Sequence, residues 1–129
     1  MNGYLLDTNV ILFTLVDDIR LSSAMRDAIA TGPNYLSLAS YWEVLIKSMK
    51  GKLDVGDPRA WWPQALKQMV AVPLTVRSEH LDQLYSLPPI HSDPFDRILI
   101  AQASAEELTL VTADAEIQRY ASQGVKVIF

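Results

Sequence analysis

Short apolar segments alternate with longer amphipathic stretches along the whole chain. The apolar segments predict strands, over residues 4–6, 35–38, 72–76, 108–112 and 125–129. The amphipathic stretches predict helices, over residues 22–31, 40–50, 78–86, 93–106 and 114–121. A further helix is expected to begin at Asp57-Pro58, and to be kinked or to start later because Pro63 falls within it.

This alternation of strands and helices predicts an α/β fold, with a mostly parallel central sheet flanked by helices on both faces. The chain has 129 residues, which is a usual size for one domain. No internal repeat, low-complexity tract or linker divides it. We therefore expect residues 1–129 to form a single domain.

Composition narrows the class of protein. Half of the residues are hydrophobic, which is enough to build a core and excludes disorder of the whole chain. The absence of cysteine excludes disulfides and thiolate metal sites, and it suits a reducing cytoplasm, where we expect the protein to reside. The first residues lack the basic start of a secretion signal, and no apolar run reaches the roughly 18 residues of a membrane span.

The charge balance argues against one mode of nucleic-acid binding. Eleven Lys and Arg residues against fifteen Asp and Glu residues give a formal net charge of −4. A protein that holds nucleic acid by an extended positive surface is therefore not expected. A local site whose positive charge comes from a metal ion stays open.

Four acidic residues fall where predicted strands end and predicted helices begin. Asp7 follows the first strand and Asp114 closely follows the fourth, whereas Glu43 and Asp96 lie in the first turns of helices. In open α/β sheets, ligands bind at this carboxyl edge. We expect the fold to bring the four carboxylates together there.

Helix capping explains several of these acids equally well when each is taken singly. Ser40-x-x-Glu43 matches a capping box, Asp93-x-x-Asp96 resembles one, and Asp114 is a suitable N-cap. Caps of this kind are common, so no single acid establishes a site.

Taken together, the acids indicate a cation, because capping does not explain why Asp7 ends an apolar strand. Two carboxylates ~4 Å apart repel by about 4 kcal/mol at an effective dielectric constant of 20. Mg²⁺ prefers oxygen ligands and commonly binds phosphate oxygens as well. The sequence therefore predicts a Mg²⁺ or Mn²⁺ site whose substrate is a phosphate ester.

Polar residues near these acids have two explanations each. Asn9 can orient a water or a carboxylate, or form a local turn. Lys47 and Lys50 can contact a phosphate backbone, although Lys47 is also placed for an i,i+4 ion pair with Glu43. Arg97 can pair with a nearby acid, Asp93 or Asp96, or with a phosphate.

Aromatic and histidine residues are less informative. Trp42, Trp61 and Trp62 can stack on bases, but large aromatic side chains more often pack in cores or interfaces. His80 and His91 have no metal-ligand spacing. Because His91 lies just before Asp93, a role at the rim of a site stays open for it.

Several segments together resemble the PIN-domain ribonucleases, most of all the VapC-type toxins of toxin–antitoxin pairs. The similar segments are Leu5-Leu6-Asp7-Thr8-Asn9-Val10, the Glu43 helix, the run from His91 to Ala103, and Leu110-Val111-Thr112-Ala113-Asp114. The run Asp93-Pro94-Phe95-Asp96-Arg97 is the most characteristic of these. The ordered set spans nearly the whole chain.

The resemblance implies a PIN-like α/β/α sandwich and a hydrolase that cleaves RNA phosphodiester bonds with Mg²⁺ or Mn²⁺. By position, the residues that match the family's metal-holding and catalytic acids are Asp7, Glu43, Asp96 and Asp114. The residues expected to support them are Asn9, Asp93, Thr112 and Arg97. Lys47 and Lys50 are candidate RNA contacts because of their charge and position, independently of the resemblance.

The resemblance also implies partners: a homodimer, and a VapB-like antitoxin whose tail covers the active site. Two other functions stay open. A PIN-fold binding module without turnover would use the same scaffold. A receiver-like signalling domain fits less well, because such domains carry adjacent acids after the first strand and Thr8 follows Asp7 here.

Overall fold

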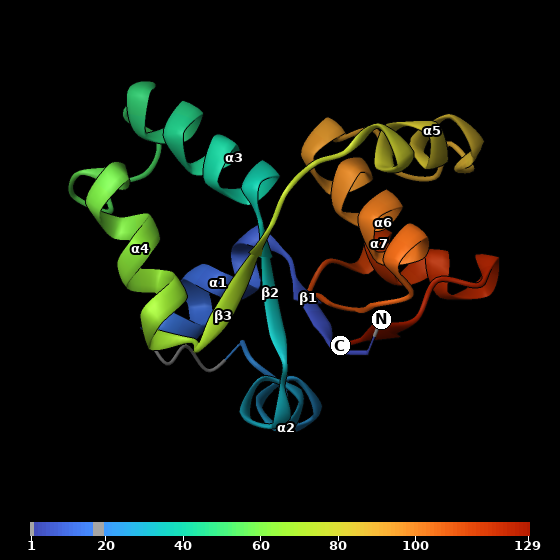
Figure 1. The fold of residues 1–129 in the computed structure, drawn as a ribbon, viewed down its shortest axis with the longest axis horizontal. Coiled ribbons are helices and arrows are strands. Elements are labelled where there is room, and N and C mark those ends of the chain that lie inside the picture. Colours follow the sequence, from blue (N-terminus) through green and yellow to red (C-terminus); the bar gives the residue numbers. More distant parts are fainter. Residues whose placement is uncertain (1, 17–19) are drawn as a thin grey trace.

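Residues 2–16 and 20–129 are described by the computed structural model, in which a five-stranded sheet lies between two groups of helices (Figure 1). The strands are β1 (Tyr4–Leu6), β2 (Asn34–Ser37), β3 (Ala71–Leu74), β4 (Thr109–Val111) and β5 (Val127–Ile128). Their order across the sheet is β3-β2-β1-β4-β5, and each neighbouring pair is parallel. The predicted α/β fold is confirmed.

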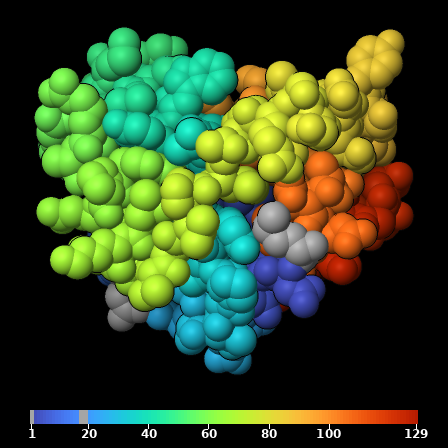
Figure 2. All heavy atoms as spheres, viewed as in Figure 1, coloured from blue at the N-terminus to red at the C-terminus, as the bar shows by residue number. Residues whose placement is uncertain are grey.

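Helices cover both faces of this sheet, as predicted. They are α1 (Thr8–Leu15), α2 (Ser23–Thr31), α3 (Leu38–Met49), α4 (Pro58–Gln68), α5 (Ser78–Ser86), α6 (Pro94–Glu106), α7 (Ala115–Gln118) and the 3₁₀ helix η1 (Arg119–Gln123). In Figure 1, α1 and α4 lie on one side of the strands, and α6 and α7 lie on the other. Figure 2 shows α3, α4 and the edge strand β3 together on one face of the surface. Within residues 2–16 and 20–129, no helix has the length and apolar character needed to cross a bilayer.

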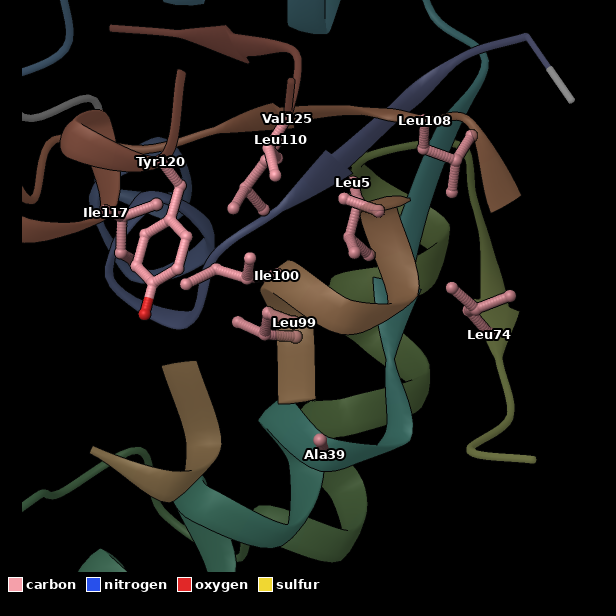
Figure 3. Packing of buried hydrophobic residues seen from close by; sticks show 11 residues of the cluster. Leu5, Ala39, Leu74, Leu99, Ile100, Leu108, Leu110, Ile117, Tyr120 and Val125 are labelled. Carbon is pink, nitrogen blue, oxygen red and sulfur yellow. The ribbon is translucent and has the colours of Figure 1, made fainter. Parts of the chain in front are cut away.

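Alternate side chains of the two central strands supply the two halves of the core. Leu5 of β1 and Leu110 of β4 pack with α6 and with Tyr120, as Figure 3 shows. The next residues along, Leu6 and Val111, pack in a second cluster with residues of α1, α2 and α4. This two-residue period is that of strands buried on both faces. The residues that directly follow β1 and β4 are therefore attached to strands that are packed on both faces.

The hydrophobic pattern does not predict α1, which follows β1 directly. Its residues are largely apolar on every side, so it lacks the polar face that marks an amphipathic helix. Val10 and Ile11 are fully buried in the core shared with α2 and α4. Tertiary packing stabilises this helix, and its presence makes Asp7 an N-cap.

The helix α3 begins two residues earlier than predicted. Its N-cap is Ser37, whose Oγ accepts a hydrogen bond from the N–H of Ala39 at 3.0 Å. The predicted capping box Ser40-x-x-Glu43 is therefore wrong, and Glu43 lies in the second turn. Ser40 accepts a hydrogen bond from the hydroxyl of Thr8 at 3.0 Å instead, which joins the starts of α1 and α3.

Other predicted boundaries shift for local reasons. α4 begins at Pro58 with Asp57 as N-cap and continues through Pro63, so a later start is wrong. Proline removes one helical hydrogen bond there, but Trp62 and Ala65 on either side of it are anchored in the core. The predicted helix over 114–121 is divided between α7 and η1, and the last strand shortens to β5.

The order of the strands reverses beside β1. From β1 the chain adds β2 and β3 on one side, and it later returns to add β4 and β5 on the other. A reversal of this kind opens a crevice at the carboxyl ends of the two strands, where ligands of α/β proteins bind. Asp7 follows β1 and Asp114 closely follows β4, so both lie at this switch point.

Replacing Ser37 by alanine should lower the free energy of unfolding by about 1 kcal/mol, because the N–H of Ala39 loses its capping acceptor at a buried position. Chemical denaturation measures this. Ser23→Ala is the matched control, since Ser23 is exposed at the first position of α2 and Ser22 provides that cap. The control should stay within about 0.5 kcal/mol of the parent. Unchanged stability in Ser37→Ala would contradict the observed start of α3.

Candidate metal centre

Asp7 is the most buried of the four predicted acids, with 3% of its surface exposed. One carboxylate oxygen accepts a hydrogen bond from the N–H of Val10 at 2.8 Å, and the other accepts one from the hydroxyl of Thr112. Burial raises the pKa of Asp7 to about 6; the charges of Asp114 and Glu43 add to the rise, and the two hydrogen bonds oppose it. The site thus disfavours the ionised form of this carboxyl.

Glu43 lies on α3 with 6% of its surface exposed. Its Oε2 forms an ion pair with the ammonium of Lys47 at 2.8 Å, which confirms the predicted i,i+4 pair. Glu43 raises the pKa of Lys47, and Asp93 and Asp96 add to the effect, so the ammonium is close to all three acids. Oε1 of Glu43 is buried without a hydrogen-bond partner among the described residues. A buried oxygen left in this state costs free energy unless a donor or a cation reaches it.

Asp96 and Asp93 lie at the start of α6. Asp93 is the N-cap, as predicted, and its Oδ1 accepts hydrogen bonds from two backbone N–H groups, including that of Asp96 at 3.1 Å. Burial raises the pKa of Asp96 to about 7; the charges of Asp93, Glu43 and Asp7 act in the same direction, and His91 opposes them. Asp96 therefore shares its surroundings with the N-cap of its own helix and with acids from two other segments of the chain.

Asp114 completes the group as the N-cap of α7. Its Oδ1 accepts a hydrogen bond from the N–H of Glu116 at 2.8 Å, as the capping alternative predicts. Its own N–H donates to the hydroxyl oxygen of Thr112 at 3.0 Å, and that hydroxyl donates to Asp7. Thr112 therefore connects the two acids that flank the switch point.

His91 lies inside the acid cluster, although its spacing in the sequence gives no such signal. The nearest ligand atoms of His91, Asp96 and Asp114 all lie within 4.8 Å of one another. The N–H of Asp93 donates to Nδ1 of the imidazole at 3.2 Å, so the ring hydrogen is on Nε2. Nε2 lies 3.0 Å from Oδ2 of Asp96 and 3.3 Å from Oδ2 of Asp114. His91 thus bridges the starts of α6 and α7.

Arg97 does not make the predicted pair with Asp93 or Asp96 among the described contacts. Its guanidinium instead donates hydrogen bonds to three backbone carbonyls and one hydroxyl, those of Leu84, Pro88, His91 and Tyr120. The Tyr120 hydroxyl, seen at the edge of the core in Figure 3, donates to the Pro88 carbonyl at 2.8 Å. Arg97 and Tyr120 therefore brace the segment that carries His91, and the sequence pattern offers no signal for this.

Asn9 and Lys50 lie at the margin of the cluster. Asn9 is exposed and, among the described residues, forms no hydrogen bond with Asp7; it borders a hollow of about 380 Å³ beside Asp114. Lys50 is exposed at the end of α3, seven residues after Glu43, which corresponds to about 10 Å along the helix. Their expected roles toward a substrate stay predictions.

The shifted pKa values of buried acids indicate this site, whereas the larger hollow in the surface lies elsewhere. A larger hollow of about 660 Å³ lies at the opposite, amino-terminal edge of the sheet, where Pro33, Asn34 and Met69 contribute to its walls. None of its lining residues is charged. Buried charges that shift each other's pKa values occur at the carboxyl edge, and such clusters are typical of functional sites.

The residues at the carboxyl edge fit a divalent cation. Oε1 of Glu43 is buried and has no hydrogen-bond partner among residues 2–16 and 20–129, and burial disfavours the ionised forms of Asp7 and Asp96. A hard cation would correct both defects, because it prefers carboxylate oxygens and favours their ionised form. The donor set of carboxylates with one imidazole nearby is compatible with Mg²⁺ or Mn²⁺.

A parallel sheet with acids gathered at its switch point is the arrangement that the sequence motifs predict. The sequence model of the PIN domain matches residues 4–123. The chain therefore belongs to the PIN domain family, which sets aside the receiver-like alternative. No curated protein matches the sequence significantly.

Several solved structures have the same fold, among them a toxin–antitoxin complex from Klebsiella pneumoniae, with a TM-score of 0.66 at 18% identity and coverages of 98% and 97%. One is DNA-bound VapBC from Salmonella typhimurium, with a TM-score of 0.70 at 16% identity, covering 99% of this chain and 98% of that one. Another is VapBC2 from Rickettsia felis bound to a promoter fragment, with a TM-score of 0.69 at 14% identity and coverages of 99% and 98%. FitAcB from Neisseria gonorrhoeae gives 0.62 at 19% identity, with coverages of 98% and 96%. Identities this low establish likeness of fold.

Asp7→Asn should stabilise the metal-free protein at pH 8. Since the pKa rises from an ordinary 3.8 to about 6 on folding, the folded protein holds a proton that the unfolded chain has lost. The stability from this proton is present at low pH and is lost as pH rises to about 6. Asparagine avoids the loss, so the free energy of unfolding in EDTA should rise by about 3 kcal/mol at pH 8 and by little at pH 4.

Urea titrations of parent and variant at the two pH values measure this difference. Asp82→Asn, which removes an exposed carboxylate from α5, is the matched control and should stay within about 0.5 kcal/mol of the parent at both. A less stable Asp7→Asn protein at pH 8 in EDTA would contradict the strain that we assign to this buried charge.

Proposed function

We propose that this protein is a metal-dependent endoribonuclease that hydrolyses RNA phosphodiester bonds, and that it is the toxin of a toxin–antitoxin pair. Residues 1–129 would form one nuclease domain. The observation that carries the proposal is the gathering of four acids at the switch point, where one buried oxygen of Glu43 has no partner in the described part of the chain. Membership of the PIN domain family supports it.

In this proposal, the residues that hold Mg²⁺ or Mn²⁺ are Asp7, Glu43, Asp96 and Asp114. When bound, such an ion supplies Lewis acidity toward a phosphoryl oxygen and activates water for attack on phosphorus. The phosphate enters a site that is negative without the ion, so substrate and ion depend on each other. This dependence explains how a chain with a net charge of −4 can act on RNA.

Neighbouring residues keep the carboxylates in place. Lys47 neutralises one oxygen of Glu43 and leaves the other available. Thr112 holds Asp7 through its hydroxyl, and His91 holds the acids of α6 and α7 through Nε2–H. Such supporting contacts preorganise ligands, so less free energy is spent on ordering the site when the ion and substrate bind.

The proposed partners follow from the same charge. A cognate VapB-like antitoxin would inhibit the enzyme by placing basic groups over the acids, where they compete with the cation. The likeness of fold to chains of toxin–antitoxin complexes supports such a partner. We further propose a cytoplasmic homodimer as the working form.

Asp7→Asn should lower RNA cleavage by at least about a hundredfold, because the site loses a charged ligand oxygen at its most buried position. The measurement is cleavage of a labelled single-stranded RNA in Mg²⁺ and in Mn²⁺. Since this variant should be more stable than the parent in EDTA, loss of activity cannot be attributed to unfolding, and circular dichroism checks this.

Asp82→Asn is the matched control and should cleave at the parental rate. EDTA should stop cleavage, and excess Mg²⁺ or Mn²⁺ should restore it. Full activity of Asp7→Asn, or cleavage that persists in EDTA, would refute the proposal. A folded parent protein that binds its antitoxin but leaves RNA intact with both metals would favour the PIN-fold binding module.

A further inference from the structure

Two aromatic residues adjoin two of the acids in the sequence, and their rings contact each other. On α3, Trp42 immediately precedes Glu43, and on α6, Phe95 immediately precedes Asp96. The rings of Trp42 and Phe95 meet edge to face, with centroids 5.0 Å apart and planes at 78°. Their neighbours Glu43 and Asp96 are close enough for their charges to interact. The contact between α3 and α6 therefore brings together two acids whose charges interact and the two aromatic residues that precede them.

Trp42 differs from Trp62 in how much of its side chain is exposed. Trp62 is 8% exposed and stacks on Tyr41, with ring centroids 5.0 Å apart and planes at 7°, so it belongs to the core. Trp42 is 53% exposed although Phe95 supports it. Figure 2 shows that α3, in teal, lies at the molecular surface. An indole that is held by a neighbouring ring and remains half exposed can stack on another planar group.

The charge of the site makes such a surface valuable for RNA. A chain with a net charge of −4 and a cluster of carboxylates cannot gain much affinity from phosphate contacts. Stacking of bases on aromatic rings does not depend on net charge, and every base has a face that can stack. The ammonium of Lys47, with 44% of its side chain exposed, lies on the same helix near the acids and can face a phosphate.

A second protein surface is the rival occupant. Leu38 and Met49 are also exposed on α3, 36% and 84%, at spacings that place them near the same side of the helix as Trp42. Trp42 differs from Leu38 and Met49 in its ring contact with Phe95, the residue before Asp96, so a second protein over the indole would also lie close to the start of α6. The position of Trp42 beside the acids favours RNA as its occupant.

We propose that Trp42, supported by Phe95, stacks on a nucleobase of single-stranded RNA adjacent to the phosphate that the acids engage. This inference rests on the proposed nuclease function. It also explains why the substrate would be single-stranded, because the bases of a duplex already stack on each other and cannot reach the indole. Trp42 would be a binding residue that tolerates different bases.

The test is binding of a labelled single-stranded RNA in Mg²⁺, measured by fluorescence anisotropy in an Asp96→Asn background that stops cleavage. Trp42→Ala should weaken binding tenfold or more, the range seen for loss of one stacked base. Trp42→Phe, which keeps an aromatic face, should stay within about threefold of the parent. A matched ribose-phosphate chain without bases should bind the parent and Trp42→Ala equally.

Two exposed residues away from the acids serve as matched controls. Met49→Ala removes an apolar side chain from the same helix, and Tyr85→Ala removes an aromatic ring that is 95% exposed on α5. Both should leave RNA affinity unchanged. If Trp42→Ala and Met49→Ala alter the molecular mass measured by light scattering while RNA affinity stays at the parental value, a second copy covers the indole and the inference is overturned.

Cleavage by proteins with intact acids separates this inference from the proposed function. Trp42→Ala should raise KM about tenfold and leave kcat nearly unchanged, as expected for loss of uniform binding. Parental KM and affinity in Trp42→Ala would refute stacking and leave the nuclease proposal standing. Trp42-dependent RNA binding without cleavage would support stacking and refute the nuclease. A parent that binds no RNA in either metal would refute both.

Discussion

Repulsion among buried carboxylates is the constraint on which the rest of this structure depends. Burial raises the pKa values of Asp7 and Asp96, and the charges of neighbouring acids add to the rise: Asp114 and Glu43 at Asp7, and Asp93, Glu43 and Asp7 at Asp96. The fold tolerates this because each acid is attached to a fixed element: the end of β1 or one of the first two turns of a helix. The positive ends of helix dipoles offset part of the charge. What the bare fold leaves uncompensated, above all at Glu43 Oε1, is what a cation would neutralise.

Capping and metal binding are compatible uses of one carboxylate. Asp114 shows this best: Oδ1 accepts a hydrogen bond from the N–H of Glu116, and Oδ2 faces His91. Asp7 likewise uses one oxygen to cap α1. A cap orients the side chain by a short, local hydrogen bond and leaves the second oxygen for a contact across the switch point, with Thr112 in Asp7 and with His91 in Asp114. Capping of α7 by Asp114 and the metal-binding role that we propose for it therefore do not exclude each other.

The surroundings of the acids are less predictable than the acids themselves. Arg97 has the charge to pair with Asp93, yet it braces the backbone near His91, because the chain bends back there and exposes several carbonyls to the guanidinium. His91 enters the cluster through this bend. Trp42 meets Phe95 through the crossing of two helices that are distant in sequence. These contacts arise from loop and helix geometry, which leaves no periodic trace in the sequence.

By itself, the sequence determined the α/β class, most strand and helix positions, the PIN resemblance and the identity of the acids, because these depend on local periodicity, capping chemistry and ordered motifs. It did not reveal α1, whose apolar residues lack a helical period, or the start of α3 at Leu38. The tertiary structure alone decided which oxygen of Glu43 stays unpaired and which side chains surround it. Those outcomes depend on how separate elements pack, and packing is a property of the whole chain.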